Sequence, residues 1–167
     1  MKNLTIAGLV IAAITLSSVH VVYSHCEIPC GIYGDKTRIT ILLEDITTIE
    51  KSMKEINRIN GIEKPSALDQ NQLVRWVKNK EEHANKVQHI VTQYFMTQRV
   101  KSSKPNYDKQ LRTLHGLLVH AMKAKQTVDV AHVEHLRKLV HEFAGVYFSP
   151  EDLKPVSYTH LTLPTKA

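Results

Sequence analysis

Residues 39–56 read ITILLEDITTIEKSMKEI, and this stretch decides the fold class. Its apolar side chains recur at spacings of three and four residues, which places them along one face of a helix. Asn60-Gly61 and Pro65 follow and predict where that helix ends. We therefore expect an amphipathic helix whose buried face carries Ile39, Leu42, Ile46, Ile49, Met53 and Ile56.

Three later segments repeat this pattern. A second helix is expected from about Ser66 or Asp69 to Thr97, a third from about Tyr107 to Lys125, and a fourth from about Val130 to Phe148. Residues 99–106, which contain two serines and a proline, read as a loop. The expected buried positions are Leu73, Trp76, Val77, Ala84, Val87, Ile90, Val91 and Tyr94 in the second helix, Leu111, Leu114, Leu118 and Met122 in the third, and Val133, Leu136, Val140, Phe143 and Tyr147 in the fourth.

These four amphipathic segments predict an all-α fold, an antiparallel four-helix bundle with short connections. No segment alternates with period two over enough length to form a strand. Neither internal repeats nor a Gly-rich phosphate loop are present.

The composition narrows the classes of partner. The chain has 22 Lys and Arg against 16 Asp and Glu, a formal net charge of +6. No basic run is interleaved with aromatic residues, so we expect no nucleic-acid partner. A mild positive excess suits a small anionic substrate, because positive potential raises its rate of encounter, although it also suits a simply soluble surface.

Residues 1–24 have the pattern of a secretory signal peptide. Lys2 supplies the charged start, an apolar core runs over residues 4–16, and Val22 and Ser24 are small enough for positions −3 and −1 of a cleavage site. Cleavage after Ser24 by a signal peptidase or maturation protease would make His25 the first residue. We therefore expect an exported protein, periplasmic or extracellular, with no membrane anchor after cleavage.

The residues after the expected cut are HCEIPCGIY, residues 25–33. A free amine and an imidazole from His25, the amide and thiol of Cys26, and the thiol of Cys30 lie within six residues, which indicates a metal site. Because export favours disulfides, a Cys26–Cys30 bridge in a small helical protein without metal is an alternative. These residues alone do not distinguish nickel from copper.

The stretch His25-Cys26-x-x-Pro29-Cys30-Gly31-x-Tyr33 resembles the nickel hook of the nickel superoxide dismutase family, and the sequence at residues 93–95, Gln-Tyr-Phe, is also similar. The resemblance implies a four-helix bundle that assembles into a homohexamer, with one nickel ion per subunit cycling between Ni2+ and Ni3+. It implies that His25, Cys26 and Cys30 are the metal ligands and that the substrate is superoxide, which is converted to hydrogen peroxide and dioxygen.

The resemblance also assigns roles around the metal. His25, as the axial ligand of the oxidised state, and Tyr33, beside the open face, are the expected catalytic residues, while Pro29 sets the turn that brings Cys30 to the metal. The family often holds the axial imidazole with a glutamate and an arginine. An ungapped comparison places Ile41 and Asn79 at those positions. The candidates for that role here are Arg38, Glu44, Asn79 and Glu82.

Two alternative functions are compatible with the same sequence. A nickel or copper carrier with the same terminal site would bind metal without turnover, and the disulfide-stapled protein would bind none.

The remaining histidines, including His132 and His135 three residues apart, are interpreted as surface or helix-end residues, since no Glu-x-x-His pair accompanies them. The native domain is expected to span residues 25–155, and residues 156–167 read as a translated sequencing adapter.

Overall fold

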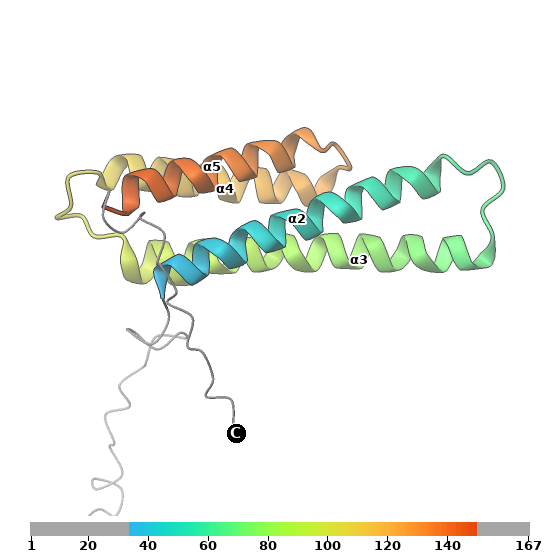
Figure 1. Cartoon of the computed structure of the whole chain (residues 1–167), viewed down its shortest axis with the longest axis horizontal. Helices are drawn as coiled ribbons and strands as arrows, with labels where there is room; N and C mark the ends of the chain where they lie inside the picture. Colours follow the sequence, from blue (N-terminus) through green and yellow to red (C-terminus); the bar gives the residue numbers. More distant parts are fainter. Residues whose placement is uncertain (1–33, 150–167) are drawn as a thin grey trace, which may run out of the picture.

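The structure, a computed structural model, describes residues 34–149. Its helices are α2 (Asp35–Asn60), α3 (Ala67–His89), α4 (Tyr107–Gln126) and α5 (Ala131–Tyr147), and a π-helix, η1 (Ile90–Arg99), continues α3 directly. No strand occurs between residues 34 and 149. The predicted all-α, antiparallel four-helix bundle is confirmed (Figure 1).

The bundle consists of two helical hairpins of unequal length. Helix α2 packs chiefly on α3 and α4 on α5, and contacts of α3 with α4 and of α2 with α5 join the two hairpins. The α2–α3 hairpin extends well beyond the α4–α5 hairpin at one end (Figure 1). At the opposite end the start of α2, the helix η1 and the end of α5 come together, and this is where the chain enters the bundle.

The interior follows the predicted stripes of α2 and α5 closely. Burying large apolar side chains supplies most of the stabilisation of such a bundle. The largest side chains that are less than 2% exposed are Phe95, Phe143, Leu42, Ile46, Ile49, Met53, Leu114, Leu117, Leu136, Val87, Val91 and Val133.

Two predicted core positions are wrong. Val77 is 40% exposed because the turns of α3 before Lys80 extend past the end of α4, which Lys80 contacts. Met122 is 41% exposed because α4 turns its small residues Ala121 and Ala124 inward instead.

Trp76, also expected in the core, is only half-buried. The ammonium of Lys51 lies 5.9 Å from the centre of its ring. The inward-facing alanines of α4 let a neighbouring helix pack closer to it. A sequence pattern of large apolar residues does not predict such close packing.

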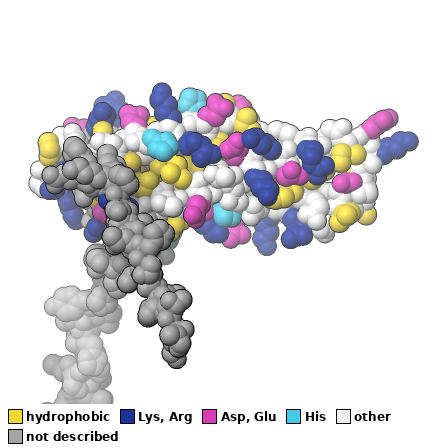
Figure 2. All heavy atoms as spheres, in the orientation of Figure 1, with side chains coloured by type: hydrophobic (Ala, Val, Ile, Leu, Met, Phe, Trp, Pro, Cys, Tyr) yellow, Lys and Arg dark blue, Asp and Glu magenta, His cyan; other side chains and the backbone are white. Residues whose placement is uncertain are grey.

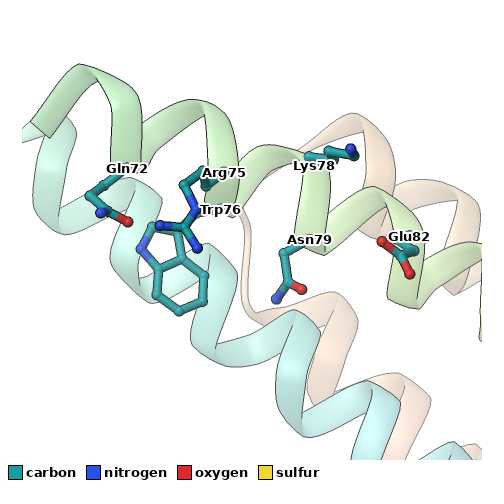
Figure 3. A pocket seen from close by; sticks show the side chains of 6 residues that line it. All are labelled: Gln72, Arg75, Trp76, Lys78, Asn79 and Glu82. Atoms are coloured by element: carbon teal, nitrogen blue, oxygen red, sulfur yellow. The ribbon is translucent and has the colours of Figure 1, made fainter. Parts of the chain in front are cut away.

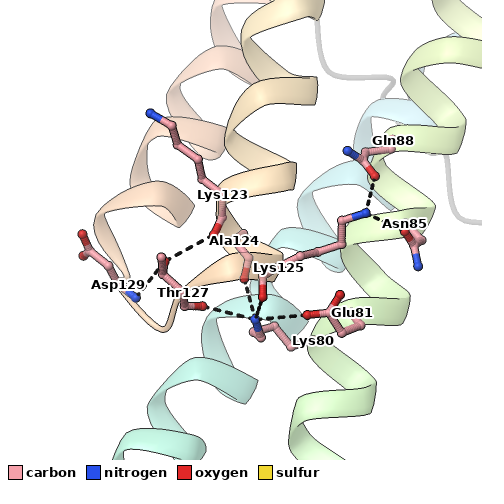
Figure 4. A network of polar contacts seen from close by, with 9 residues as sticks. All are labelled: Lys80, Glu81, Asn85, Gln88, Lys123, Ala124, Lys125, Thr127 and Asp129. Atoms are coloured by element: carbon pink, nitrogen blue, oxygen red, sulfur yellow. Dashed lines mark hydrogen bonds and ion pairs between the residues drawn. The ribbon is translucent and has the colours of Figure 1, made fainter.

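Polar contacts fix the ends of the helices. Ser66 and Asp69 form a reciprocal capping box at the start of α3, in which the Asp69 amide donates to the Ser66 hydroxyl and the Ser66 amide donates to the Asp69 carboxylate. At the end of α4, the buried ammonium of Lys80 donates to the carbonyls of Ala124, Lys125 and Thr127 (Figure 4). Lys80, a residue of α3, therefore caps the last turn of α4.

The second helix changes its hydrogen-bonding register at Ile90. The sequence predicts one continuous helix to Thr97, whereas residues from Ile90 to Arg99 form a π-helix of 10 residues. The hydroxyl of Thr97 and the side-chain amide of Gln98 each donate to the carbonyl five residues earlier. π-Helical turns are uncommon and often accompany functional sites, because they change which side chains share one face.

The surface of the described residues mixes charges of both signs, and Figure 2 shows basic and acidic side chains interspersed over the visible face. Among residues 34–149, no helix is both long and apolar enough to span a membrane.

Candidate functional site at the start of helix α2

The expected metal ligands His25, Cys26 and Cys30, together with Tyr33, lie outside the described residues. The description begins at Gly34, whose backbone is extended with φ −77° and ψ 129°, and α2 begins at the next residue, Asp35. The structure therefore shows the part of the bundle to which the predicted hook is covalently attached.

The carboxylate of Asp35 accepts four hydrogen bonds from three side chains. Its Oδ1 accepts from the Tyr94 hydroxyl at 2.5 Å and from Arg99 Nε at 2.8 Å. Its Oδ2 accepts from Arg99 Nη2 at 2.9 Å and from the Tyr147 hydroxyl at 2.7 Å. One carboxylate thus joins the first residue of α2 to η1 and to the last residue of α5. We call these four residues the Asp35 cluster.

The π-helix accounts for two of these donors. Tyr94 and Arg99 are five residues apart, and in a helix with i→i+5 hydrogen bonds such residues lie on one side. Both reach the same carboxylate oxygen. The Arg99 guanidinium adds a two-pronged pair with the carboxylate, the strongest geometry available to these groups.

The charge states in the cluster reinforce each other. Burial alone would raise the pKa of Asp35, but the hydrogen bonds from Arg99, Tyr94 and Tyr147 together lower it below the ordinary value of 3.8. Burial and the hydrogen bond to Asp35 raise the pKa of Tyr94 to about 12, and the same two causes raise the pKa of Tyr147. At neutral pH the carboxylate is ionised and both hydroxyls remain donors.

The rings of Tyr94 and Tyr147 pack against other aromatic rings. Phe95 is fully buried, and its ring meets Tyr94, Phe143 and Tyr147 edge-on with centroids 5.1, 4.8 and 5.6 Å away. Edge-to-face contacts of this kind restrict ring orientation as well as burying apolar area. The hydroxyls that bind Asp35 are consequently held by packed rings.

Arg38, one of the sequence candidates, lies beside this cluster. Its guanidinium carbon is 5.5 Å from the centre of the Tyr94 ring, as is that of Arg99, so the ring has two cationic neighbours. Arg38 also lines a cavity of about 590 Å³ between α2 and α3, together with Ile41, Asp45, Glu82, Asn85, Lys86, His89 and Ile90.

A second cavity, of about 700 Å³, lies against the Asp35 cluster. It is lined by Asp35, Arg99 and Tyr147 and by residues of the loop before α4 and the end of α5. A hollow of about 520 Å³ on α3, lined by Trp76 and five polar residues, contains neither histidine nor cysteine (Figure 3). The first two of these three hollows therefore lie near the end of the bundle that carries the Asp35 cluster.

The other three candidates do not form a carboxylate–cation pair between helices. Glu44 is exposed. Glu82 pairs with Lys86 within α3 at 3.1 Å, and the Asn79 side-chain amide donates to the Ser52 hydroxyl at 3.0 Å. Their proposed role in orienting the His25 ring remains a prediction.

A carboxylate–imidazole pair does connect α2 and α3. It consists of Asp45 and His83, each of which lies one position after a residue that the sequence suggested. Asp45 Oδ1 lies 2.7 Å from His83 Nδ1, and the Asp45 side chain is only 7% exposed. Burial raises the pKa of Asp45 above 3.8, although the hydrogen bond from His83 lowers it in part. Its spacing of three from Leu42 and four from Ile49 places Asp45 on the buried stripe, and that spacing was the available signal.

Three histidines lie together on α4 and α5. The ring of His120 is 5.4 Å from His132 and 4.6 Å from His135 between centroids. Nδ1 of His120 and of His132 are buried without a hydrogen-bond partner. The interpretation as surface or helix-end residues is therefore incomplete, since two of the rings are partly enclosed.

The donor chemistry of the predicted hook suits a metal. Within residues 34–149, no group of three or more His, Cys, Asp or Glu is placed to hold a metal ion. The chain's two cysteines are Cys26 and Cys30. Two thiols beside nitrogen donors are a set that suits nickel or copper.

A protein-family model matches most of the chain. The family model described as nickel-containing superoxide dismutase matches residues 20–150, which covers both the hook sequence and the whole helical bundle. No curated protein and no solved structure matches the chain. The match extends over far more than half of the 167 residues. The chain therefore belongs to the nickel-containing superoxide dismutase family, and it is an oxidoreductase that uses nickel and acts on superoxide.

Proposed function

We propose that the nickel of this superoxide dismutase is held by a hook at residues 25–33, with His25, Cys26 and Cys30 as ligands. The observation that carries the proposal is the family match over residues 20–150, which includes these residues. Support comes from the donor set, because the chain's only two thiols lie four residues apart beside a histidine. Removal of residues 1–24 would add the terminal amine of His25 to this set.

The reaction consumes two superoxide anions and two protons and yields one dioxygen and one hydrogen peroxide. One nickel ion per subunit would supply the one-electron couple, between Ni2+ and Ni3+, that this exchange requires. The thiolates of Cys26 and Cys30 are strong, soft donors that favour the higher oxidation state, and the His25 imidazole would add a further donor to it. Thiolate character is therefore what the hook contributes.

Tyr33 would control access to this site. In the sequence, Tyr33 stands two residues before Asp35. Its hydroxyl would order water or superoxide beside the metal and exclude larger anions. Pro29 would set the turn that returns Cys30 to the metal, and Gly31 would let the backbone pass close to it.

Export and assembly are further parts of the proposal. A terminal segment of nine residues makes few contacts of its own and needs a wall to hold ligand geometry. We expect that a neighbouring subunit in a homohexamer supplies part of it. Sizing of the processed protein should give a particle several times the monomer mass, and an active monomer would remove this part of the proposal.

The function is tested on protein whose amino terminus is confirmed as His25. We expect about one nickel per chain, two free thiols after metal removal, and superoxide dismutation that depends on nickel. Nickel binding without turnover would favour a carrier. A Cys26–Cys30 disulfide with no bound metal would favour the stapled helical protein.

A further inference from the structure

We propose that Asp35 is a positioning residue for the nickel hook: its carboxylate holds in place the helix start to which residues 25–33 are joined. The inference rests on the proposed function of the hook, but it concerns a different residue. Asp35 is not a ligand and need not touch superoxide. It acts through the backbone of Tyr33 and Gly34, which connects it to the hook.

The first argument is the position of the cluster in the chain. The ends of a helix fray more readily than its middle, and at the start the first amides have no partner within the helix. Gly34, at the cap of α2, makes no side-chain cap. The Asp35 carboxylate instead ties this first turn to η1 and α5 by four hydrogen bonds. The helix start is thus held by the other two segments.

The second argument is reach. Only five positions separate Cys30 from Asp35 in the sequence, and an extended chain advances at most about 3.6 Å per residue. If the position of Asp35 varies, the position of Tyr33, only two residues earlier in the chain, varies with it. Metal ligands must hold their places within about 0.5 Å to keep their geometry, which a frayed helix start cannot ensure.

The third argument is that the cluster keeps its charges. The lowered pKa of Asp35 and the raised pKa of Tyr94 leave one anion and its donors unchanged through the neutral range. Arg99 is 31% exposed and Asp35 18% exposed at the side chain, so the pair is partly shielded from water. Such partly buried, two-pronged pairs restrict geometry more than surface pairs do.

Asp35→Asn is the test, because asparagine keeps the shape and loses the charge and one acceptor oxygen. Asp69→Asn is the matched control, since Asp69 is also an acid in the first turn of a helix, at the far end of the α2–α3 hairpin. Both are made in the chain that begins at His25. Nickel affinity is measured by calorimetry on metal-free protein, the visible absorption spectrum of the Ni2+-loaded protein is recorded, and helicity is checked by far-ultraviolet circular dichroism.

We expect Asp35→Asn to weaken nickel binding on the order of tenfold, the scale seen when groups outside the ligand set are removed, and to broaden the nickel spectrum. Asp69→Asn should leave both unchanged. Unchanged affinity and spectrum in a folded Asp35→Asn protein would overturn the inference. If that variant does not fold, Tyr147→Phe, which removes one hydrogen bond to Asp35 and keeps the ring, decides by the same readouts. Failure of the unaltered protein to bind nickel would instead reject the proposed function.

Discussion

Asp45 of α2 and His83 of α3 form a carboxylate–imidazole pair inside the longer hairpin, with 2.7 Å between Oδ1 and Nδ1. The other oxygen of Asp45 is buried without a partner. The pair is therefore an incompletely satisfied polar contact between two helices that are otherwise joined by apolar packing.

His83→Ala should destabilise the protein by about 1–3 kcal/mol near pH 7, because it leaves a buried carboxylate without that hydrogen bond. Since the pKa of Asp45 is already raised, the folded state takes up a proton more readily than the unfolded state. The deficit should consequently shrink as the pH falls through that raised pKa. Urea unfolding at pH 7 and over a series of lower pH values measures both effects. His115→Ala, at an exposed position of α4, is the control, and an equal loss in the control would contradict this account.

Lys80→Met should weaken the junction between α3 and α4. The Lys80 ammonium donates at 2.8 Å to Ala124 and at 3.2 Å to Thr127, and its side chain is 4% exposed (Figure 4). Methionine fills similar space but leaves the last carbonyls of α4 unpaired, at a cost of about 1–3 kcal/mol in the free energy of unfolding. Lys78→Met, at an exposed position on the same helix, should cost little. Equal midpoints for both variants in thermal unfolding would show that the cap contributes nothing.

The histidine group on α4 and α5 should make the bundle sensitive to mild acid. Burial, and then the neighbouring His135, His132 and Lys123, lower the pKa of His120 below its ordinary value of 6.5. The unfolded chain therefore binds a proton at a pH where folded His120 remains neutral, and stability falls as the pH drops through 6.5. Replacing His120 with glutamine should reduce the change in melting temperature between pH 8 and pH 5.5. A change as large as that of the unaltered protein would assign the acid sensitivity to other groups.

Cys26→Ser and Cys30→Ser should each abolish nickel-dependent turnover while leaving the bundle folded. A serine hydroxyl stays protonated at neutral pH and is a poor donor for an oxidised metal. Neither cysteine lies on one of the apolar stripes of the four predicted helices. Circular dichroism should therefore match the unaltered protein, with activity at background. Loss of helical signal would indicate that the two cysteines have a structural role.

The sequence predicted the fold well where large apolar residues repeat. The boundaries of α2, α4 and α5 fall within a few residues of those expected, because Asn60-Gly61, the loop before Tyr107 and the residues around Ser149 interrupt clear stripes. Val77 and Met122 were misplaced because a stripe does not reveal where a neighbouring helix ends or where small residues allow closer packing.

The features around the candidate site were harder to predict. The apolar pattern carries no signal of the change to a π-helix at Ile90, and in a regular α-helix Tyr94 and Arg99, five residues apart, do not share one face. Asp35 reads in the sequence as an ordinary acid in a first helical turn. Its role becomes visible only when residues 59, 64 and 112 positions away are brought to it by the fold.

The most direct measurement compares two chains that differ by one residue: the protein beginning at His25 and the same protein with an alanine added before His25. If the terminal amine and a free His25 belong to the nickel site, the added alanine should reduce nickel affinity and abolish superoxide dismutation, with circular dichroism unchanged. Full nickel binding and full activity in the extended chain would contradict the account of the hook.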